Sequence, residues 1–310
     1  MAQWAIGIDG GGTKTTACLV NPEGIVVKRL TTSATNYSQQ NEKEEEICSI
    51  IMKTLATLRS HAPDVDPSNF VIGVCLSGLG RVDQQARLRT ILESHQTGMK
   101  IVVSSDAVGT LYGAFGGDDG IILISGTGSI AFAKTNGKDI LRCGGWGYLL
   151  GDEGSGFAIA KAGIAAALRD WEKRGPATRL RPAFEKEFAV ESIQLGISTI
   201  YAQFATRGQL AGFAPLVFNC ADQGDTVARK IVDQAAQDLF DLIQPLLVKF
   251  PEKATVGLAL IGNIFKNERL KKNLLQSISS KYPGCKVGAP RFEPEHGAAI
   301  MALKEVAAPD

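Results

Sequence analysis

The chain has 310 residues, 45% of them hydrophobic, and its 33 basic residues nearly balance 32 acidic ones. This length suffices for two domains with separate cores. The formal net charge of +1 gives no reason to expect nucleic acid or an anionic membrane surface as a partner. The chain has no run of 18 apolar residues and no N-terminal leader pattern, so we expect a soluble cytoplasmic protein.

The cysteine pattern agrees with a reducing compartment. The six cysteines are scattered, and no two of them lie two to four residues apart. This spacing does not support a zinc site or an iron–sulfur cluster, and it argues against a disulfide framework. We therefore expect reduced thiols.

The chain opens with a glycine-rich turn between two apolar segments. Residues 4–8 lead into Asp9-Gly10-Gly11-Gly12-Thr13-Lys14, and residues 17–20 are apolar again. A strand, and not a helix, follows the glycines, which excludes a Walker A loop and a dinucleotide fingerprint. A further strand from about residue 24 completes a three-strand meander.

Three polar residues, Asp9, Ser77 and Asp106, are each expected at the end of a predicted strand. A polar loop over 31–41 contains Asn36, and Asn41 is predicted to cap a helix with an acidic first turn. Strands at 70–76 and 101–103 precede Ser77-Gly78 and Asp106, separated by a helix over 84–94. Because the ligand crevice of an open sheet lies at the carboxyl ends of its strands, we expect Asp9, Ser77 and Asp106 at one rim.

The second half repeats the glycine turn. Residues 121–124 lead into Ser125-Gly126-Thr127-Gly128-Ser129, and aligning Gly10 with Gly126 also aligns Gly12 with Gly128. Two such hairpins, with free backbone N–H groups, would suit a polyphosphate held from both sides. The alternative is that each is only a tight turn.

A glycine cluster follows at 144–156, from which we expect Trp146 and Asp152 to project. The alternative is an exposed loop whose Trp146 fills a core. Helical periodicity then runs over about 157–222 with breaks at 175–176 and 207–208, which predicts a helical insert. Gly212 near its last helix indicates close approach by another helix or by a ligand.

The remainder alternates between helix and strand. We expect a helix over 225–249, a strand over 256–261 that ends at Gly262-Asn263, and a solvated charged segment over 266–272. A strand near 285–287 and a closing helix over 294–305 complete the chain. The predicted domains are 1–115 and 116–292, with the closing segment 293–310 returning to the first domain.

This organisation resembles the actin-like ATPase and sugar-kinase superfamily, and within it the N-acetylglucosamine kinase family of the BadF/BadG/BcrA/BcrD ATPase group. The segments that carry the resemblance are 9–13, 35–36, 77–78, 105–107, 125–129, 143–147, 151–155 and 211–213. It implies an α/β fold of two actin-like, ribonuclease H-like domains, each with a β-meander and βαβ units.

The resemblance also implies roles for individual residues. Asp106 would be the general base, and Asp9 would hold hydrated Mg²⁺. The positions matching the ATP site are Gly11, Gly12, Thr13, Lys14, Gly126, Thr127, Gly128, Gly212, Gly262 and Asn263. The positions matching the sugar site are Asn36, Ser77, Gly78, Asp106, Gly145, Trp146 and Asp152.

The implied activity is phosphorylation of the 6-hydroxyl of an amino sugar by ATP, with N-acetylglucosamine favoured over glucosamine. Tyr37 and Leu79 differ from the animal enzymes and leave the 2-substituent of the sugar open. A second hypothesis is an ATPase that activates a partner enzyme, and a third is a sugar sensor without catalysis. We further expect a homodimer whose domains close on the sugar.

Overall fold

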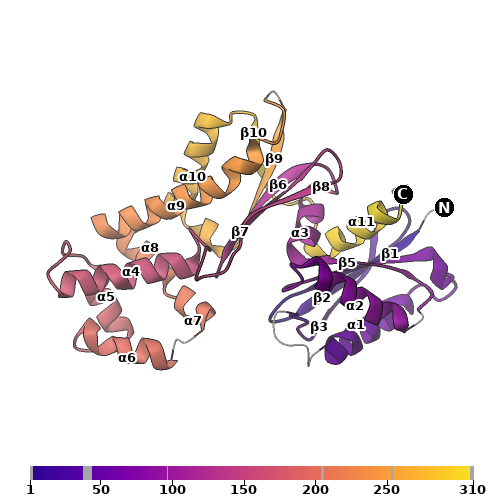
Figure 1. Ribbon diagram of the computed structural model, residues 1–310, viewed down its shortest axis with the longest axis horizontal. Helices are drawn as coiled ribbons and strands as arrows, with labels where there is room; N and C mark the ends of the chain where they lie inside the picture. Colours follow the sequence, from indigo (N-terminus) through magenta and orange to yellow (C-terminus); the bar gives the residue numbers. More distant parts are fainter. Residues whose placement is uncertain (1–2, 38–43, 96, 204–205, 253, 308–310) are drawn as a thin grey trace. The chain divides into compact units, whose positions relative to one another are not determined.

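The computed structural model describes residues 3–37, 44–95, 97–203, 206–252 and 254–307. These form two compact units, of which unit 1 comprises residues 1–120 and 289–310 and unit 2 comprises residues 121–288. Figure 1 shows strands and helices in both units. The α/β class predicted from the sequence is confirmed. Among the described residues, no helix is long and apolar enough to cross a bilayer.

The sheet that the described residues form in unit 1 has the strand order β3-β2-β1-β4-β5. The strands are β1 Trp4–Gly10, β2 Thr15–Val20, β3 Val26–Thr32, β4 Phe70–Leu76 and β5 Lys100–Ser105. The first three form the predicted antiparallel meander. β4 pairs with β1, and β5 with β4, in parallel. The carboxyl ends of β1, β4 and β5 therefore lie side by side at one edge.

Helices cover both faces of this sheet. They are α1 Glu44–Arg59, α2 Val82–Ser94, α3 Asp106–Phe115 and α11 Pro294–Ala307, with a short 3₁₀ turn η2 Pro67–Asn69. Alternate strand residues such as Ile6 and Ile8 pack with α1 and α2, whereas Ala5 packs with α11. The predicted cap Asn41 lies outside the described residues.

The closing helix packs closely on the sheet because glycines face it. A Cβ atom on Gly7 or Gly73 would lie within 2 Å of a backbone oxygen of α11. α11 itself crosses α3 through Gly297, whose added Cβ would lie 2.0 Å from the Gly109 carbonyl oxygen. Figure 1 shows α11, in yellow, beside α3 although their residues are far apart in the sequence.

Unit 2 repeats the meander. Its described sheet has the order β10-β9-β6-β7-β8. The strands are β6 Gly120–Ser125, β7 Ser129–Thr135, β8 Asp139–Gly144, β9 Val256–Ile261 and β10 Cys285–Gly288. β9 pairs with β6 in parallel, so Asn263 and the glycine turn after Ser125 lie at the same edge of the sheet.

The predicted helical insert is present and carries much of the core of unit 2. Its helices are α4 Gly156–Trp171, α5 Leu180–Glu187, α6 Ile193–Gln203, α7 Arg207–Ala211 and α8 Ala214–Asp222. After the insert come α9 Thr226–Leu247, the 3₁₀ turn η3 Asn263–Lys266 and α10 Glu268–Lys281. The predicted break at 207–208 is instead a short helix, α7. Its first turn is held by a capping box between Thr206 and Gln209.

Candidate active site

In unit 1, three predicted site residues meet at the carboxyl edge of the sheet. Asp9 is the last residue but one of β1, Ser77 follows β4, and Asp106 follows β5. The Ser77 side chain hydrogen-bonds the Asp106 carboxylate, which also accepts from the Ala107 N–H at 2.8 Å. The Ser77 N–H donates to the Gly10 carbonyl oxygen at 2.8 Å and so ties this rim to the first glycine turn.

The predicted sugar loop reaches the same rim. Thr35 is fully buried, and its hydroxyl lies 2.7 Å from the hydroxyl of Thr15. The Tyr37 N–H donates to the Ser77 carbonyl oxygen at 2.8 Å. Between these two anchors, Asn36 places its side-chain nitrogen 3.4 Å from where a Cβ of Gly12 would stand. One edge of unit 1 therefore gathers residues assigned to the sugar and to the phosphates.

Both carboxylates of this rim bind protons more tightly than usual. Burial, with the charges of Asp106 and Glu295 as smaller causes, raises the pKa of Asp9 to about 7, although Lys14 opposes this shift. Burial also raises the pKa of Asp106, against the hydrogen bonds from Ala107 and Ser77. A base with a pKa nearer neutrality is better suited to accept a proton from a hydroxyl.

The Asp9 carboxylate fits the requirements of a magnesium ion. Among the described residues, no group of three or more His, Cys, Asp or Glu side chains is placed to hold a metal. Mg²⁺ does not need such a cage, because it is commonly held by one or two carboxylates together with waters and substrate phosphates. The elevated pKa of Asp9 reflects an uncompensated buried charge, which a cation beside it would stabilise.

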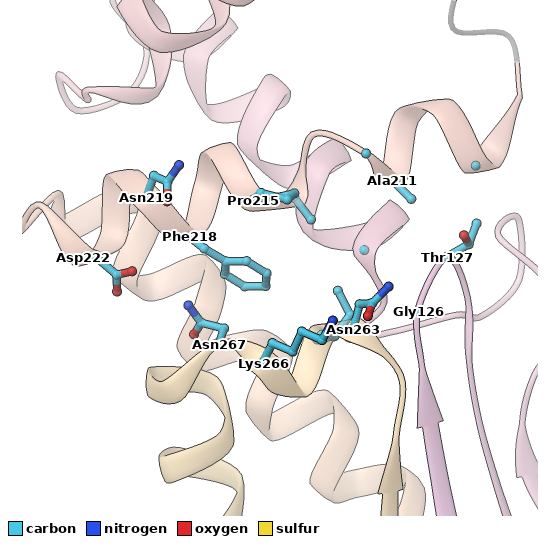
Figure 2. Close-up of a pocket in the computed structure, with 15 residues that line it drawn as sticks. Gly126, Thr127, Ala211, Pro215, Phe218, Asn219, Asp222, Asn263, Lys266 and Asn267 are labelled. Carbon is cyan, nitrogen blue, oxygen red and sulfur yellow. The ribbon is translucent and has the colours of Figure 1, made fainter. Parts of the chain in front are cut away.

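In unit 2, the glycine turn opens into a cavity of about 570 Å³, within the usual range for small-molecule sites. It is lined by Gly126, Thr127, Gly156, Gly208, Ala211, Gly212, Ala214, Pro215, Phe218, Asn219, Asp222, Asn263, Ile264, Lys266 and Asn267. Figure 2 shows Thr127 at the tip of the hairpin on one side and Asn219 and Asp222 of α8 on the other, with the Phe218 ring between them. The cavity thus combines an apolar ring, amide side chains and a glycine turn.

Several glycines around these turns have no packing reason to be glycine. A Cβ on Gly126 or Gly208 would meet nothing within 4 Å, and neither residue has a positive φ. In the first turn, Gly11 and Gly12 would place a Cβ at 3.5 and 3.4 Å from the nearest atom, which is ordinary contact. The absence of side chains leaves room for another molecule to approach the backbone.

The predicted glycine cluster folds against the second turn. The Ser125 hydroxyl donates to the Gly154 carbonyl oxygen at 3.1 Å, and that of Ser129 donates to the Glu153 carbonyl oxygen at 2.6 Å. The Gly156 N–H donates to the Gly126 carbonyl oxygen at 2.8 Å. The N-terminus of α4 therefore lies at the glycine turn, although α4 begins some thirty residues later in the chain.

The other predicted residues of this cluster occupy different environments. Trp146 is 67% exposed, so the alternative in which it fills a core is wrong. The Arg142 guanidinium lies 4.5 Å from the centre of its ring. Gly145 packs its backbone against Ile130, and Asp152 is buried beneath Gly128. Gly262 has a φ of 115°, its backbone packs on the Ser125 carbonyl oxygen, and it does not itself line the cavity.

The cavity brings together Gly126, Thr127, Gly212 and Asn263 from the predicted nucleotide residues. Sequence reasoning missed the α8 side chains, Phe218 and Asn219 among them, and also missed Lys266 and Asn267. The prediction of a solvated face over 266–272 is wrong for Leu270, which is fully buried, whereas Lys266 is exposed as predicted and lines the cavity together with Asn267. The sequence feature that could have identified Lys266 and Asn267 is their position shortly after the predicted strand end at Gly262-Asn263.

The two meander sheets, each with a glycine turn, define an α/β protein of the actin-like ATPase class. The BadF/BadG/BcrA/BcrD ATPase family model matches residues 6–302, and the chain belongs to this family. The resemblance noted in the sequence is thereby confirmed.

Relatives align with nearly the whole chain. An N-acetylmuramic acid/N-acetylglucosamine kinase of Clostridium acetobutylicum is 29% identical, over 98% of this chain and 99% of its own length. The N-acetyl-D-glucosamine kinase of Dictyostelium discoideum is 30% identical, over 96% and 97% respectively. The solved structure of a "putative N-acetylglucosamine kinase" from Chromobacterium violaceum matches with a TM-score of 0.73 at 26% identity, covering 97% of this chain and 99% of that one.

Proposed function

We propose that this protein transfers the γ-phosphoryl group of ATP to the 6-hydroxyl of an amino sugar, most directly N-acetylglucosamine. The observation that carries the proposal is the Asp106 carboxylate, which is desolvated and bonded by Ser77 at the rim that also holds Asn36 and Asp9. Such a carboxylate is suited to accept a proton from a bound hydroxyl. The names of the full-length relatives support the same chemistry.

The proposed mechanism assigns separate tasks to the two units. In unit 1, Asn36, Ser77 and Gly78 orient the sugar while Asp106 holds the 6-hydroxyl and accepts its proton as the phosphoryl group transfers. In unit 2, Gly126, Thr127, Gly212 and Asn263 receive the nucleotide, and Gly145, Trp146 and Asp152 are assigned to the sugar. The backbone of Gly11, Gly12 and Thr13, with Lys14, is assigned to the phosphates. A magnesium ion beside Asp9 would neutralise phosphate charge.

The preference for an acetylated sugar follows from the placement of carboxylates. A free 2-ammonium group needs an anionic partner when it is buried, because an unpaired buried charge is costly. Asp106 is assigned to the 6-hydroxyl group and Asp9 to the metal, and the carboxylate of Asp152, assigned to the sugar from the resemblance, is already paired with Arg207. An acetamido group instead needs a hydrogen-bond partner, which Ser77 could provide, and an apolar surface, which the exposed Trp146 ring could provide, whereas Leu79 is fully buried in the core of unit 1.

A direct test is the identity of the product and the choice of sugar. We expect phosphorus NMR of the product from N-acetylglucosamine to show a 6-phosphate ester. Values of kcat/KM should be compared for N-acetylglucosamine, N-acetylmuramic acid, glucosamine and glucose, since this quantity measures discrimination. If glucosamine is preferred tenfold or more, the acetamido assignment fails while the kinase assignment stands.

The ATPase-activator hypothesis has less support. Activators of that kind share an iron–sulfur cluster between subunits through cysteines, whereas four cysteines here are buried and Cys143 and Cys285 are only partly exposed. The homodimer and the cytoplasmic location stay predictions, to be checked by light scattering of the purified protein and by cell fractionation.

A further inference from the structure

An ion pair joins the second glycine turn to the wall of the cavity in unit 2. Arg207, the first residue of α7, places Nη1 3.1 Å from Oδ2 of Asp152. The two residues are 55 positions apart in the sequence. The Asp152 side chain is only 4% exposed, but the Arg207 side chain is 45% exposed. One end of this pair is therefore fixed inside the protein while the other remains accessible.

The glycine turn fixes the Asp152 carboxylate. Its Oδ1 accepts from the Ser129 N–H at 3.3 Å, and its Oδ2 lies 2.8 Å from where a Cβ on Gly128 would stand. Asp152 also holds a left-handed backbone with φ of 62°, which is uncommon for a residue with a side chain. Because the carboxylate contacts the turn directly, it holds the Arg207 guanidinium at a set position beside Gly128.

The same short helix forms part of the cavity wall. Gly208 and Ala211 of α7 line the cavity together with Gly126 and Thr127. Ala211 is also within 3.4 Å of where a Cβ on Gly156 would stand, so α7 lies against the N-terminus of α4. Figure 2 shows Ala211 on the Thr127 side of the cavity, away from Asp222. Arg207 itself does not line the cavity, but it directly precedes Gly208 in α7 and so adjoins the wall on the side of the glycine turn.

We propose that Arg207 binds the phosphates of the nucleotide, and that Asp152 is the positioning residue that orients its guanidinium. This inference rests on the proposed function, which places a nucleotide in this cavity. The contact with Asp152 runs through Nη1, and guanidinium carries five N–H donors in a planar fork that matches phosphate oxygens. A cation held beside a phosphate-binding turn lowers the cost of gathering phosphate charge there.

The proposal separates phosphate binding from cavity shape, so the test uses ligands that differ in phosphates alone. Calorimetry in EDTA, which removes any contribution from a metal, would give the affinities of adenosine, ADP and a non-hydrolysable ATP analogue. Arg207→Gln should bind adenosine within about twofold of the wild type but lose at least about tenfold in the affinity for ADP and the analogue. Arg207→Lys should recover part of this loss because the charge is kept.

Two further variants complete the design. Arg181→Gln is the matched control, because Arg181 also pairs with a buried aspartate in unit 2, with Nε 3.1 Å from Oδ2 of Asp170, and neither residue lines the cavity. It should leave all three affinities unchanged. Asp152→Asn, which keeps a residue tolerant of positive φ, should keep adenosine binding and lose several-fold in ADP affinity.

The results that would overturn the proposal are distinct from failure of the proposed function. If Arg207→Gln weakens adenosine as much as ADP, Arg207 only holds α7 in place. If it weakens neither, the residue has no part in nucleotide binding. If Asp152→Asn leaves the ADP affinity unchanged, the positioning role of Asp152 is wrong. If the wild type binds none of the three ligands, it is the nucleotide assignment of the cavity that fails.

Discussion

At the scale of single residues, the site depends on carboxylates that are costly to bury. Asp106 and Asp9 lie on neighbouring parts of one sheet edge, and burial is the largest cause of the raised pKa of each. Such groups concentrate at functional sites because their reactivity depends on the environment that destabilises their charge. They are also expected to lower the stability of the ligand-free protein.

The base assignment predicts a kinetic defect without a binding defect. Asp106→Asn should keep sugar and nucleotide affinities but lower kcat by roughly 10²- to 10⁴-fold, because the amide cannot accept the hydroxyl proton. Asp118→Asn, which changes an exposed carboxylate of the same unit, should leave kcat unchanged. Near-normal turnover by the Asp106 variant would remove this residue from the mechanism.

The raised pKa of Asp9 predicts a pH-dependent stability. Between pH 3.8 and about 7 the folded protein keeps a proton on Asp9 that the unfolded chain releases, so stability falls as the pH rises through this window. The full penalty, on the order of 4 kcal/mol by the size of the shift, is present above pH 7. Asp9→Asn should remove it.

Thermal unfolding in EDTA from pH 5 to pH 8 measures this effect. The advantage of the Asn variant over the wild type in melting temperature should grow from pH 5 to pH 8, because more of the Asp9 penalty is present at each higher pH up to about 7. A difference that does not change with pH would show that the buried Asp9 charge is not destabilising.

At the scale of elements, the second glycine turn is proposed to leave its backbone open to a nucleotide. Gly126→Ala should leave the melting temperature nearly unchanged, because its Cβ would meet nothing within 4 Å. It should weaken ADP and ATP binding by about tenfold or more, since a methyl group would occupy the space where backbone approaches phosphate. Isothermal titration and thermal unfolding measure the two effects separately.

A matched control for this variant is Gly288→Ala, at the end of β10, where a Cβ also meets nothing within 4 Å. It should change neither stability nor affinity. Equal nucleotide affinity in the Gly126 variant and the control would be inconsistent with phosphate binding at this turn.

The packing of α11 on α3 is a second prediction at this scale. Alanine is favoured over glycine in a helix by about 1 kcal/mol, but a Cβ on Gly297 would lie 2.0 Å from a backbone oxygen that cannot rotate away. The steric cost should exceed the gain, so Gly297→Ala should destabilise the protein by about 1–3 kcal/mol in urea unfolding. Stabilisation by this variant would show that the two helices are not in such close contact.

The sequence predicted elements well wherever local periodicity determines them. Both glycine hairpins, the long helix α9 and the closing helix α11 follow from apolar spacing and turn residues. β8 received no bounds because all six of its residues are exposed or partly exposed, so it lacks a buried apolar run. The contact of α4 with the glycine turn has no local signal, since it depends on how the insert packs back on the sheet.

At the scale of the whole molecule, one part of the candidate site was predictable from the sequence and another part was not. The rim of Asp9, Ser77 and Asp106 was predictable because strand ends of a parallel sheet lie together. The α8 wall of the cavity and the Arg207–Asp152 pair were not, because helical periodicity shows which face of a helix is apolar but not what the polar side chains meet. Long-range contacts of this kind require the tertiary structure.

The central claim is that the protein uses ATP to phosphorylate a sugar. The most direct measurement is the rate of ADP release by the purified wild type, with and without N-acetylglucosamine. We predict little ADP release without sugar, a strong increase that saturates with N-acetylglucosamine, and loss of that increase in Asp106→Asn. ADP release that is unaffected by N-acetylglucosamine, N-acetylmuramic acid, glucosamine or glucose would contradict the kinase assignment and favour an ATPase that acts on a partner.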